Sequence, residues 1–209
     1  MWRGTPPPEL THLRQYFDTQ EPNVRRAYYL VSNYVCAAGI TEAACEGAVV
    51  VDRFWPSTVA YSRGDGLATP SSMPEDLLAL LPQWIVPLLL YLEPAERARR
   101  VRERSERSKG ETVVTEEEKV LEQRPDHRAR VERAYRELTI GGTSLAVINA
   151  VGDEAHVCDA VMRTIDGMNN EDILPTQPAS RTQHASALAL TAGSAVLLLA
   201  MRFRALRIT

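Results

Sequence analysis

Three short apolar runs along the chain have the pattern of strands that are buried on both faces. They span residues 48–51, 85–92 and 144–149, and each is uninterrupted by charge. Continuous runs of this length, rich in Val, Leu and Ile, are typical of parallel sheets covered on both sides. Pro87 lacks an N–H group, so we expect the pairing of the second run to start after it.

Apolar residues recur at helical spacing between and around these runs. We expect helices over residues 9–17, 23–46, 94–108, 116–138 and 153–168. The second is either continuous or divided near Gly39, and the fourth is broken near Pro125. Strands that alternate with helices predict an α/β domain with a parallel sheet, here a three-layer αβα fold over residues 1–168.

Residues 169–209 have a different pattern. Residues 169–184 are polar, contain two prolines and are predicted to form a linker. Residues 185–201 carry no charge, and at about 1.5 Å per residue a helix of this length reaches the lower limit for crossing a bilayer. Two interpretations of residues 185–209 stay open: a membrane anchor, or a buried or interfacial helix or tail without function.

Composition narrows the choice of partners. The net charge of −3 indicates no nucleic-acid partner, and 44% hydrophobic residues suffice for a core. We expect no secretory signal in the first residues, which lack a long apolar stretch. The cysteines (Cys36, Cys45 and Cys158) are too widely spaced for structural zinc and are expected to be buried, reduced side chains. The expected location is mitochondrial or cytoplasmic.

A charged pair, Asp52-Arg53, directly follows the first apolar run. Ligands of open α/β sheets bind beyond the carboxyl ends of the strands. A guanidinium contacts phosphate oxygens in a bidentate manner and keeps its charge. The pair therefore indicates a phosphate site, although an Asp-Arg pair that only caps a strand is the alternative.

The segment that contains this pair, VVVDRFWPSTVAY from Val49 to Tyr61, resembles the DR(Y/F/H)xxSxxAY signature of thymidylate kinases. The resemblance extends from about Thr5 to Met168. It implies a P-loop kinase-type fold and the ATP-dependent, Mg²⁺-requiring phosphorylation of a pyrimidine nucleoside monophosphate. By this resemblance Arg53 holds the acceptor phosphate, Asp52 orients Arg53 or the magnesium shell, and Ser57 and Tyr61 line the acceptor pocket.

The segment PNVRRAYYLVSNYVCA resembles the acceptor-binding helix of the same family. The resemblance implies that Tyr28 or Tyr29 stacks on the pyrimidine base and that Asn33 forms a hydrogen bond nearby; core packing is the alternative for the tyrosines. Asn33-Tyr34 stands where the thymidylate branch has Asn-Arg, so the segment is more similar to the mitochondrial UMP-CMP kinase branch. The acceptor stays open among UMP, CMP, dUMP, dCMP and dTMP.

The basic run within residues 93–104 resembles the start of the kinase lid, PxERxxRxxxR. This match selects Arg97, Arg100 and Arg104. Lid arginines stabilise charge on a transferring phosphoryl group and exclude water, and Arg100 and Arg104 are the expected catalytic pair. A solvated helix face with i,i+4 ion pairs is the alternative. Ala150 and Val151, after the third run, are expected beside the adenine of ATP.

The family's phosphate-binding loop, GxxxxGK[ST], does not occur in these 209 residues, where Gly110 is the only glycine preceded by lysine. The resemblance thus predicts the family fold without its first strand and P-loop. Three hypotheses follow: a phosphotransferase, a catalytically inactive shortened isoform, and a membrane-tethered interaction protein. A homodimer is expected by analogy with the family.

Overall fold

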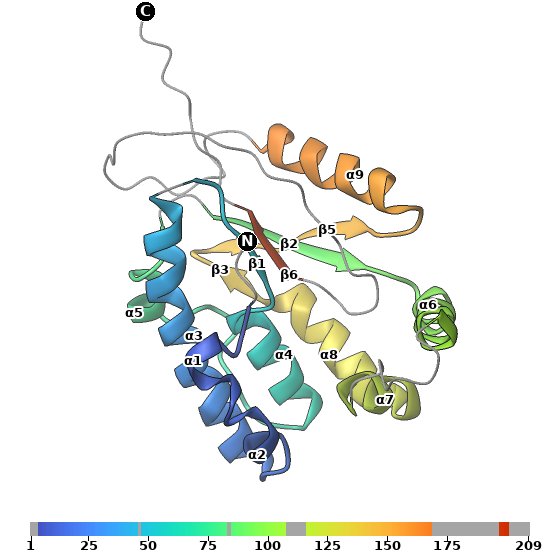
Figure 1. Cartoon of the computed structure of the whole chain (residues 1–209), viewed down its shortest axis with the longest axis horizontal. Helices are drawn as coiled ribbons and strands as arrows, with labels where there is room; N and C mark the ends of the chain where they lie inside the picture. Colours follow the sequence, from blue (N-terminus) through green and yellow to red (C-terminus); the bar gives the residue numbers. More distant parts are fainter. Residues whose placement is uncertain (1–3, 46, 83–84, 108–115, 169–196, 201–209) are drawn as a thin grey trace, which may run out of the picture.

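The computed structural model describes residues 4–45, 47–82, 85–107, 116–168 and 197–200. In this part of the chain, helices cover both faces of a four-stranded sheet (Figure 1). The sheet has the strand order β1 (Val50–Asp52), β6 (Leu197–Ala200), β2 (Val86–Tyr91) and β5 (Ala146–Asn149). A separate hairpin of β3 (Thr139–Ile140) and β4 (Thr143–Ser144) was not expected from the sequence.

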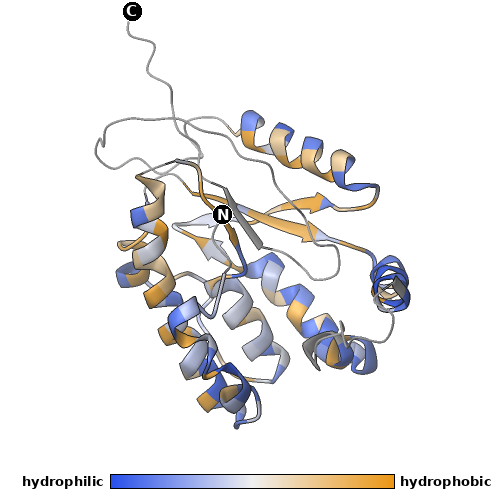
Figure 2. Ribbon diagram, in the orientation of Figure 1, coloured by the Kyte–Doolittle hydropathy of each residue, from blue (hydrophilic) through white to orange (hydrophobic). Residues whose placement is uncertain are grey.

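Alternating residues of β2 divide the core between the two faces of the sheet. Val86, Leu88 and Leu90 pack with Val157 and Val161 of α9 (Glu154–Gly167). Leu89 joins the larger cluster under α3 (Pro22–Ala44), α4 (Trp55–Gly64) and α8 (Pro125–Glu137). Because successive side chains of a strand point to opposite faces, a continuous apolar run serves both layers. Figure 2 shows hydrophobic strands at the centre and a hydrophilic α6 (Pro94–Arg107) at the periphery.

The sheet is mixed, which corrects the expectation of a parallel sheet. β2 and β5 pair in parallel, with Leu88 opposite Ala146. β6 pairs antiparallel with both of its neighbours, and Ala200 lies opposite both Val50 and Val86. Because β1 and β2 both oppose β6, they run parallel to each other. The carboxyl ends of β1, β2 and β5 therefore lie at one edge of the sheet.

For the apolar run of residues 185–201, a membrane anchor, a buried or interfacial helix and a tail without function were the expected alternatives, and its described part is not a helix. Leu197–Ala200 form β6 between β1 and β2. A short uncharged run satisfies a buried strand as well as a helix, and the pattern alone does not separate the two. The rest of this run and the predicted linker 169–184 lie outside the described residues. Among the helices that the structure describes, none is long and apolar enough to span a membrane.

The expected N-terminal helices are present with changed bounds. The predicted helix 9–17 is two short helices, α1 (Pro8–Thr11) and α2 (Arg14–Asp18), while α3 continues through Gly39. The apolar valines of α3 do not face the core: Val24, Val31 and Val35 are 44%, 57% and 38% exposed. The buried face instead carries mainly small or polar residues: Tyr28, Ser32, Asn33, Cys36, Ala37, Ile40 and Ala44.

The remaining helices follow the sequence closely. α6 and α9 form as expected, and Pro125 separates α7 (Glu116–Gln123) from α8, which begins at that proline. The short helix α5 (Glu75–Leu78) was not anticipated. Cys36 is buried as expected, whereas Cys45 is exposed and Cys158 half-buried. The described residues contain no group of three or more potential metal ligands among His, Cys, Asp and Glu.

Candidate functional site at the carboxyl edge of the sheet

The turn between β1 and α4 brings Arg53 to the edge of the sheet in a left-handed backbone conformation. Arg53 has φ +62°, which costs an L-residue roughly 1–2 kcal/mol compared with the right-handed region. The chain then extends through Phe54 and enters α4 at Trp55-Pro56. Such strained non-glycine residues cluster at functional sites. The strain therefore marks this turn as a candidate for binding or catalysis.

The side chain of Arg53 lies over α4. Its guanidinium carbon is 5.5 Å from the centre of the Tyr61 ring, a cation–π distance. The N-cap residue Phe54 offers no side-chain cap to the first turn of α4. A helix N-terminus carries partial positive charge, so Arg53 and this turn together favour an anion.

Asp52, the neighbour of Arg53 in the sequence, is half-buried. Its Oδ1 atom is buried and has no hydrogen-bond partner among the described residues. Burial raises the pKa of the Asp52 carboxyl above 3.8, and the charge of Arg53 opposes that rise. A buried carboxylate oxygen of this kind is suited to a cation or a hydrogen-bond donor that belongs to a ligand.

Ser57 and Asn33 are held by buried hydrogen bonds behind the Asp52-Arg53 turn. The hydroxyl of Tyr135 on α8 donates to Oγ of Ser57 at 2.9 Å. Nδ2 of Asn33 donates to Oγ1 of Thr58 at 3.1 Å. These two bonds tie α4 to α8 and to α3. Oδ1 of Asn33 is buried and has no partner in the described part of the chain.

Tyr28 and Tyr29 contact the N-terminal helices in this conformation. The ring of Tyr28 stacks on Phe17, with centroids 4.5 Å apart, and its hydroxyl donates to the Leu10 carbonyl. The hydroxyl of Tyr29 donates to Asp18 at 2.7 Å. Phe17 covers one face of the Tyr28 ring, which is only 5% exposed, so a pyrimidine base could stack on it only after a rearrangement of its neighbours. The base-binding role of these two residues stays a prediction.

The lid arginines lie on α6, which follows β2 at the same edge. Arg97 donates to Oε1 of Glu122 on α7 at 2.9 Å. Arg100 donates to Glu96 and to the carbonyls of Ala150 and Gly152. The structure thus brings the predicted lid and the predicted donor-base loop into direct contact.

Arg104 and Val151, two further residues predicted for the site, lie on α6 and in the loop after β5. Arg104 is half-buried on α6, and Val151, in the loop after β5, is 45% exposed. These positions do not show what either residue binds. The catalytic role of Arg104 and the adenine-binding role of Val151 therefore stay predictions.

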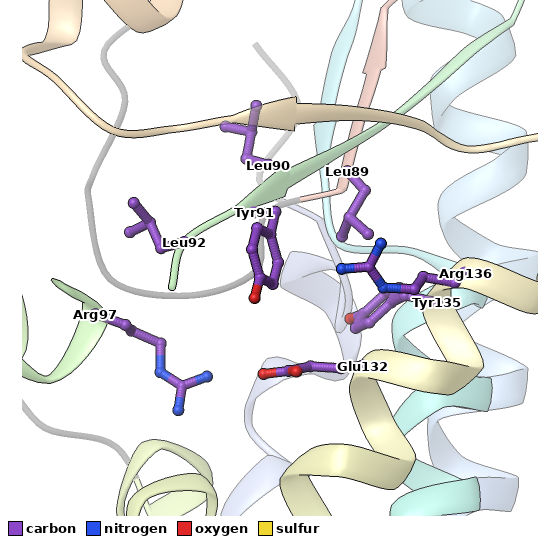
Figure 3. Close-up of a pocket in the computed structure, with 8 residues that line it drawn as sticks. All are labelled: Leu89, Leu90, Tyr91, Leu92, Arg97, Glu132, Tyr135 and Arg136. Atoms are coloured by element: carbon purple, nitrogen blue, oxygen red, sulfur yellow. The ribbon is translucent and has the colours of Figure 1, made fainter. Parts of the chain in front are cut away.

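A cavity of about 30 Å³ lies where β2, α6 and α8 meet (Figure 3). Arg97 and Glu132 lie on either side of the space below Tyr91 in this view, and Tyr135 lies to the right beside Arg136. The lining residues are Leu89, Leu90, Tyr91, Leu92, Arg97, Glu132, Tyr135 and Arg136. This volume accommodates about one or two water molecules. The cavity is therefore too small to hold a nucleotide.

Tyr135 and His127 on α8 are the structural partners that sequence reasoning left without a role. His127 is buried beside Tyr61, with ring centroids 6.5 Å apart, and its Nε2 lies 3.3 Å from Oδ1 of Asp65. Burial lowers the pKa of His127 below 6.5, and Asp65 opposes that change. His127, Val131, Ala134 and Tyr135 form the buried stripe of α8. Its helical spacing was visible in the sequence, and polar members of a buried stripe require partners.

These features define an α/β protein with an arginine, Arg53, in a candidate anion site at the carboxyl ends of parallel strands. A family model for thymidylate kinase matches residues 5–161, more than half of the chain. The chain belongs to the thymidylate kinase family, and membership implies a kinase that acts on nucleotides. Comparison with curated proteins and with solved structures gave no match.

Proposed function

We propose that this protein binds a pyrimidine nucleoside monophosphate at the Asp52-Arg53 turn and takes part in its ATP-dependent phosphorylation to the diphosphate. The carrying observation is Arg53, held in a left-handed conformation at the end of β1 with its guanidinium over Tyr61. A guanidinium in this place binds two phosphate oxygens and remains charged throughout the reaction.

The surrounding side chains support a positioning role for the turn. Ser57 is fixed by Tyr135, and Tyr61 lies between Arg53 and His127. Phosphoryl transfer requires alignment of the acceptor and donor and stabilisation of charge, with little covalent chemistry by the protein. A rigid turn that presents one arginine therefore meets the main requirement on the acceptor side.

Asp52 could supply one of the oxygen ligands that a magnesium ion requires at this site. The buried Oδ1 of Asp52 is a carboxylate oxygen without a partner among the described residues, and Mg²⁺ is commonly bound by one or two carboxylates together with phosphate oxygens. When bound, the ion supplies positive charge to the transferring phosphoryl group. Asp52 would hold it or its water shell.

The described residues do not provide the glycine-rich cradle that donor phosphates need. The strand between β1 and β2 is β6, which runs antiparallel to both. Its carboxyl end therefore lies at the edge of the sheet opposite Arg53. This strand cannot lead into a phosphate-binding loop at the site. The observation favours a second candidate function: monophosphate binding without transfer.

The UMP-CMP preference is part of the proposal. Tyr34 occupies the position after Asn33, and its hydroxyl donates to Asp76 at 2.8 Å. A tyrosine held in this way lacks the guanidinium donors of the thymidylate branch. We therefore expect UMP or CMP to be preferred over dTMP. The homodimer and the mitochondrial or cytoplasmic location stay predictions.

A coupled assay of ADP formation tests the proposal. The full chain is incubated with ATP, Mg²⁺ and UMP, CMP or dTMP, and Arg53→Lys is compared with Arg14→Lys. Arg14 pairs with Asp18 on the surface of α2 and serves as the matched control. We expect turnover that Arg53→Lys lowers at least roughly tenfold and Arg14→Lys leaves unchanged. Saturable monophosphate binding without turnover would establish the second candidate, and absence of both would exclude the proposed function.

A further inference from the structure

Two arginines that are neighbours on α6 have different surroundings. Arg99 is bonded to Glu96 and Glu103 of its own helix, and its side chain is 50% exposed. Arg100 also binds Glu96, at 2.8 Å, but its side chain is only 15% exposed. Arg100 continues to a second element: its Nη2 donates to the carbonyls of Ala150 at 3.1 Å and Gly152 at 2.8 Å.

The loop that Arg100 contacts is short and fixed at both ends. The N–H of Ala150 donates to the Tyr91 carbonyl, and the N–H of Val151 donates to the Asn149 side chain. Asp153 then caps α9 by accepting from the His156 N–H at 2.8 Å. Between these anchors, the carbonyls of residues 150 and 152 both face Arg100.

Gly152 makes this arrangement possible. It has φ +116°, a conformation that side chains rarely adopt, and a Cβ atom there would lie 3.1–3.3 Å from the His156 side chain. The backbone can therefore turn its carbonyl toward α6. A guanidinium is the side chain that can bind two carbonyls and a carboxylate at once, whereas a lysine ammonium lacks the planar fork.

We propose that Arg100 is a positioning residue that couples the β5–α9 loop, residues 150–153, to helix α6. A rearrangement of the loop removes hydrogen bonds from Arg100, and movement of α6 removes the same bonds from the loop. Such coupling is reciprocal because it is one free energy shared by two elements. The link rests on the hydrogen bonds of Arg100 alone; its response to nucleotide rests also on the proposed function.

Hydrogen exchange of the full chain without nucleotide tests the link directly. The variants are Arg100→Gln, Arg100→Lys and the matched control Arg99→Gln, each compared with the wild type. We expect Arg100→Gln to accelerate exchange in both α6 and residues 150–153 by roughly tenfold, since charge-assisted hydrogen bonds to the loop are lost. Arg100→Lys should give a smaller change in both segments, and Arg99→Gln a change in α6 only. Unchanged exchange at residues 150–153 in Arg100→Gln would overturn the proposal.

A second arm adds ATP with Mg²⁺ to the same proteins. In the wild type, we expect ATP to change exchange in residues 150–153 and in α6 together. In Arg100→Gln, the change should remain in residues 150–153 and be lost from α6. An equal response of α6 in both proteins would contradict the coupling. If ATP changes neither segment in the wild type, donor binding by the proposed function fails, while the first arm still decides the link.

Discussion

The hydroxyl of Tyr135 donates a hydrogen bond to Oγ of Ser57 across 2.9 Å, and both side chains are buried. This bond joins α8 to the first turn of α4, where Ser57 lies three residues after Phe54. Burial raises the pKa of Tyr135, so the hydroxyl stays protonated and remains a donor. The acceptor half of the site is thereby fixed from a helix some 80 residues away.

Replacement of Tyr135 by Phe tests the contribution of this bond. We expect a loss of about 1 kcal/mol in the free energy of unfolding, because the buried Ser57 loses its partner. Urea unfolding measures it. Tyr34→Phe removes an exposed hydroxyl bond to Asp76 and should change stability by less than about 0.5 kcal/mol. Equal effects of the two substitutions would show that the buried bond has no special role.

Asp52 should show opposite effects on stability and function. Burial raises its pKa in the folded protein, so the carboxylate is destabilised there relative to the unfolded chain. Folding stability therefore falls as the pH rises from about 3.8 through the raised pKa. Asp52→Asn should be more stable than the wild type at neutral pH and should lose turnover.

Asp153→Asn is the control for Asp52→Asn, since asparagine also caps a helix and Asp153 is exposed at the start of α9. It should change neither stability nor turnover. Thermal unfolding in parallel with the coupled assay provides both readings. A less stable Asp52→Asn variant would contradict the assignment of Asp52 as an unfavourably buried charge.

For His127 we predict a pH dependence of folding stability that is opposite in direction to that of Asp52. Burial lowers its pKa below 6.5, so just below pH 6.5 the unfolded chain binds a proton that the folded protein resists. Stability is therefore lost as the pH falls from 6.5 through the lowered pKa. His127→Gln can still donate to Asp65 but does not titrate. Urea unfolding at about pH 7.5 and about pH 5.5 should show a smaller loss for His127→Gln; equal losses would exclude His127 as the source.

The C-terminal strand provides a test of the sheet topology. Leu199 lies opposite both Val51 and Pro87, in the strand that joins β1 to β2. Leu199→Pro removes a backbone donor and should lower the free energy of unfolding by at least about 1 kcal/mol. Leu199→Val keeps the donor and a strand-forming side chain and serves as the control. If both variants are equally stable, β6 is not an integral strand.

Sequence patterning anticipated the part of the fold that depends on long apolar runs. The runs that contain β1, β2 and β5, the break at Pro125 and the charged α6 were visible because each has a strong local signal. Val24, Val31 and Val35 lie at helical spacing on α3 but outside the core, and mainly small or polar residues form the buried face instead. β6 was missed because an apolar run fits a strand or a helix, and only the open edges of β1 and β2 decide between them.

In the candidate site, too, the sequence indicates local segments but not their tertiary partners. Asp52, Arg53, Ser57 and Tyr61 were predicted because the segment that contains them follows a strand and resembles a family signature. Their partners Tyr135 and His127 lie on α8, and local patterns do not specify which distant helix packs against a turn. The contact of Arg100 with the loop of residues 150–153 also depends on tertiary packing. Hydrogen bonds of this kind become evident only when the elements are assembled.

The central claim is that Arg53 binds the phosphate of a nucleoside monophosphate. Equilibrium binding of UMP and of uridine to the full chain, with Arg53→Ala beside the wild type, tests it most directly. We expect the wild type to bind UMP roughly 10- to 100-fold more tightly than uridine, the range for loss of a charge-assisted contact. In Arg53→Ala this difference should disappear while uridine binding is retained. Equal affinity of the wild type for UMP and uridine, or an unchanged preference for UMP in Arg53→Ala, would contradict the account.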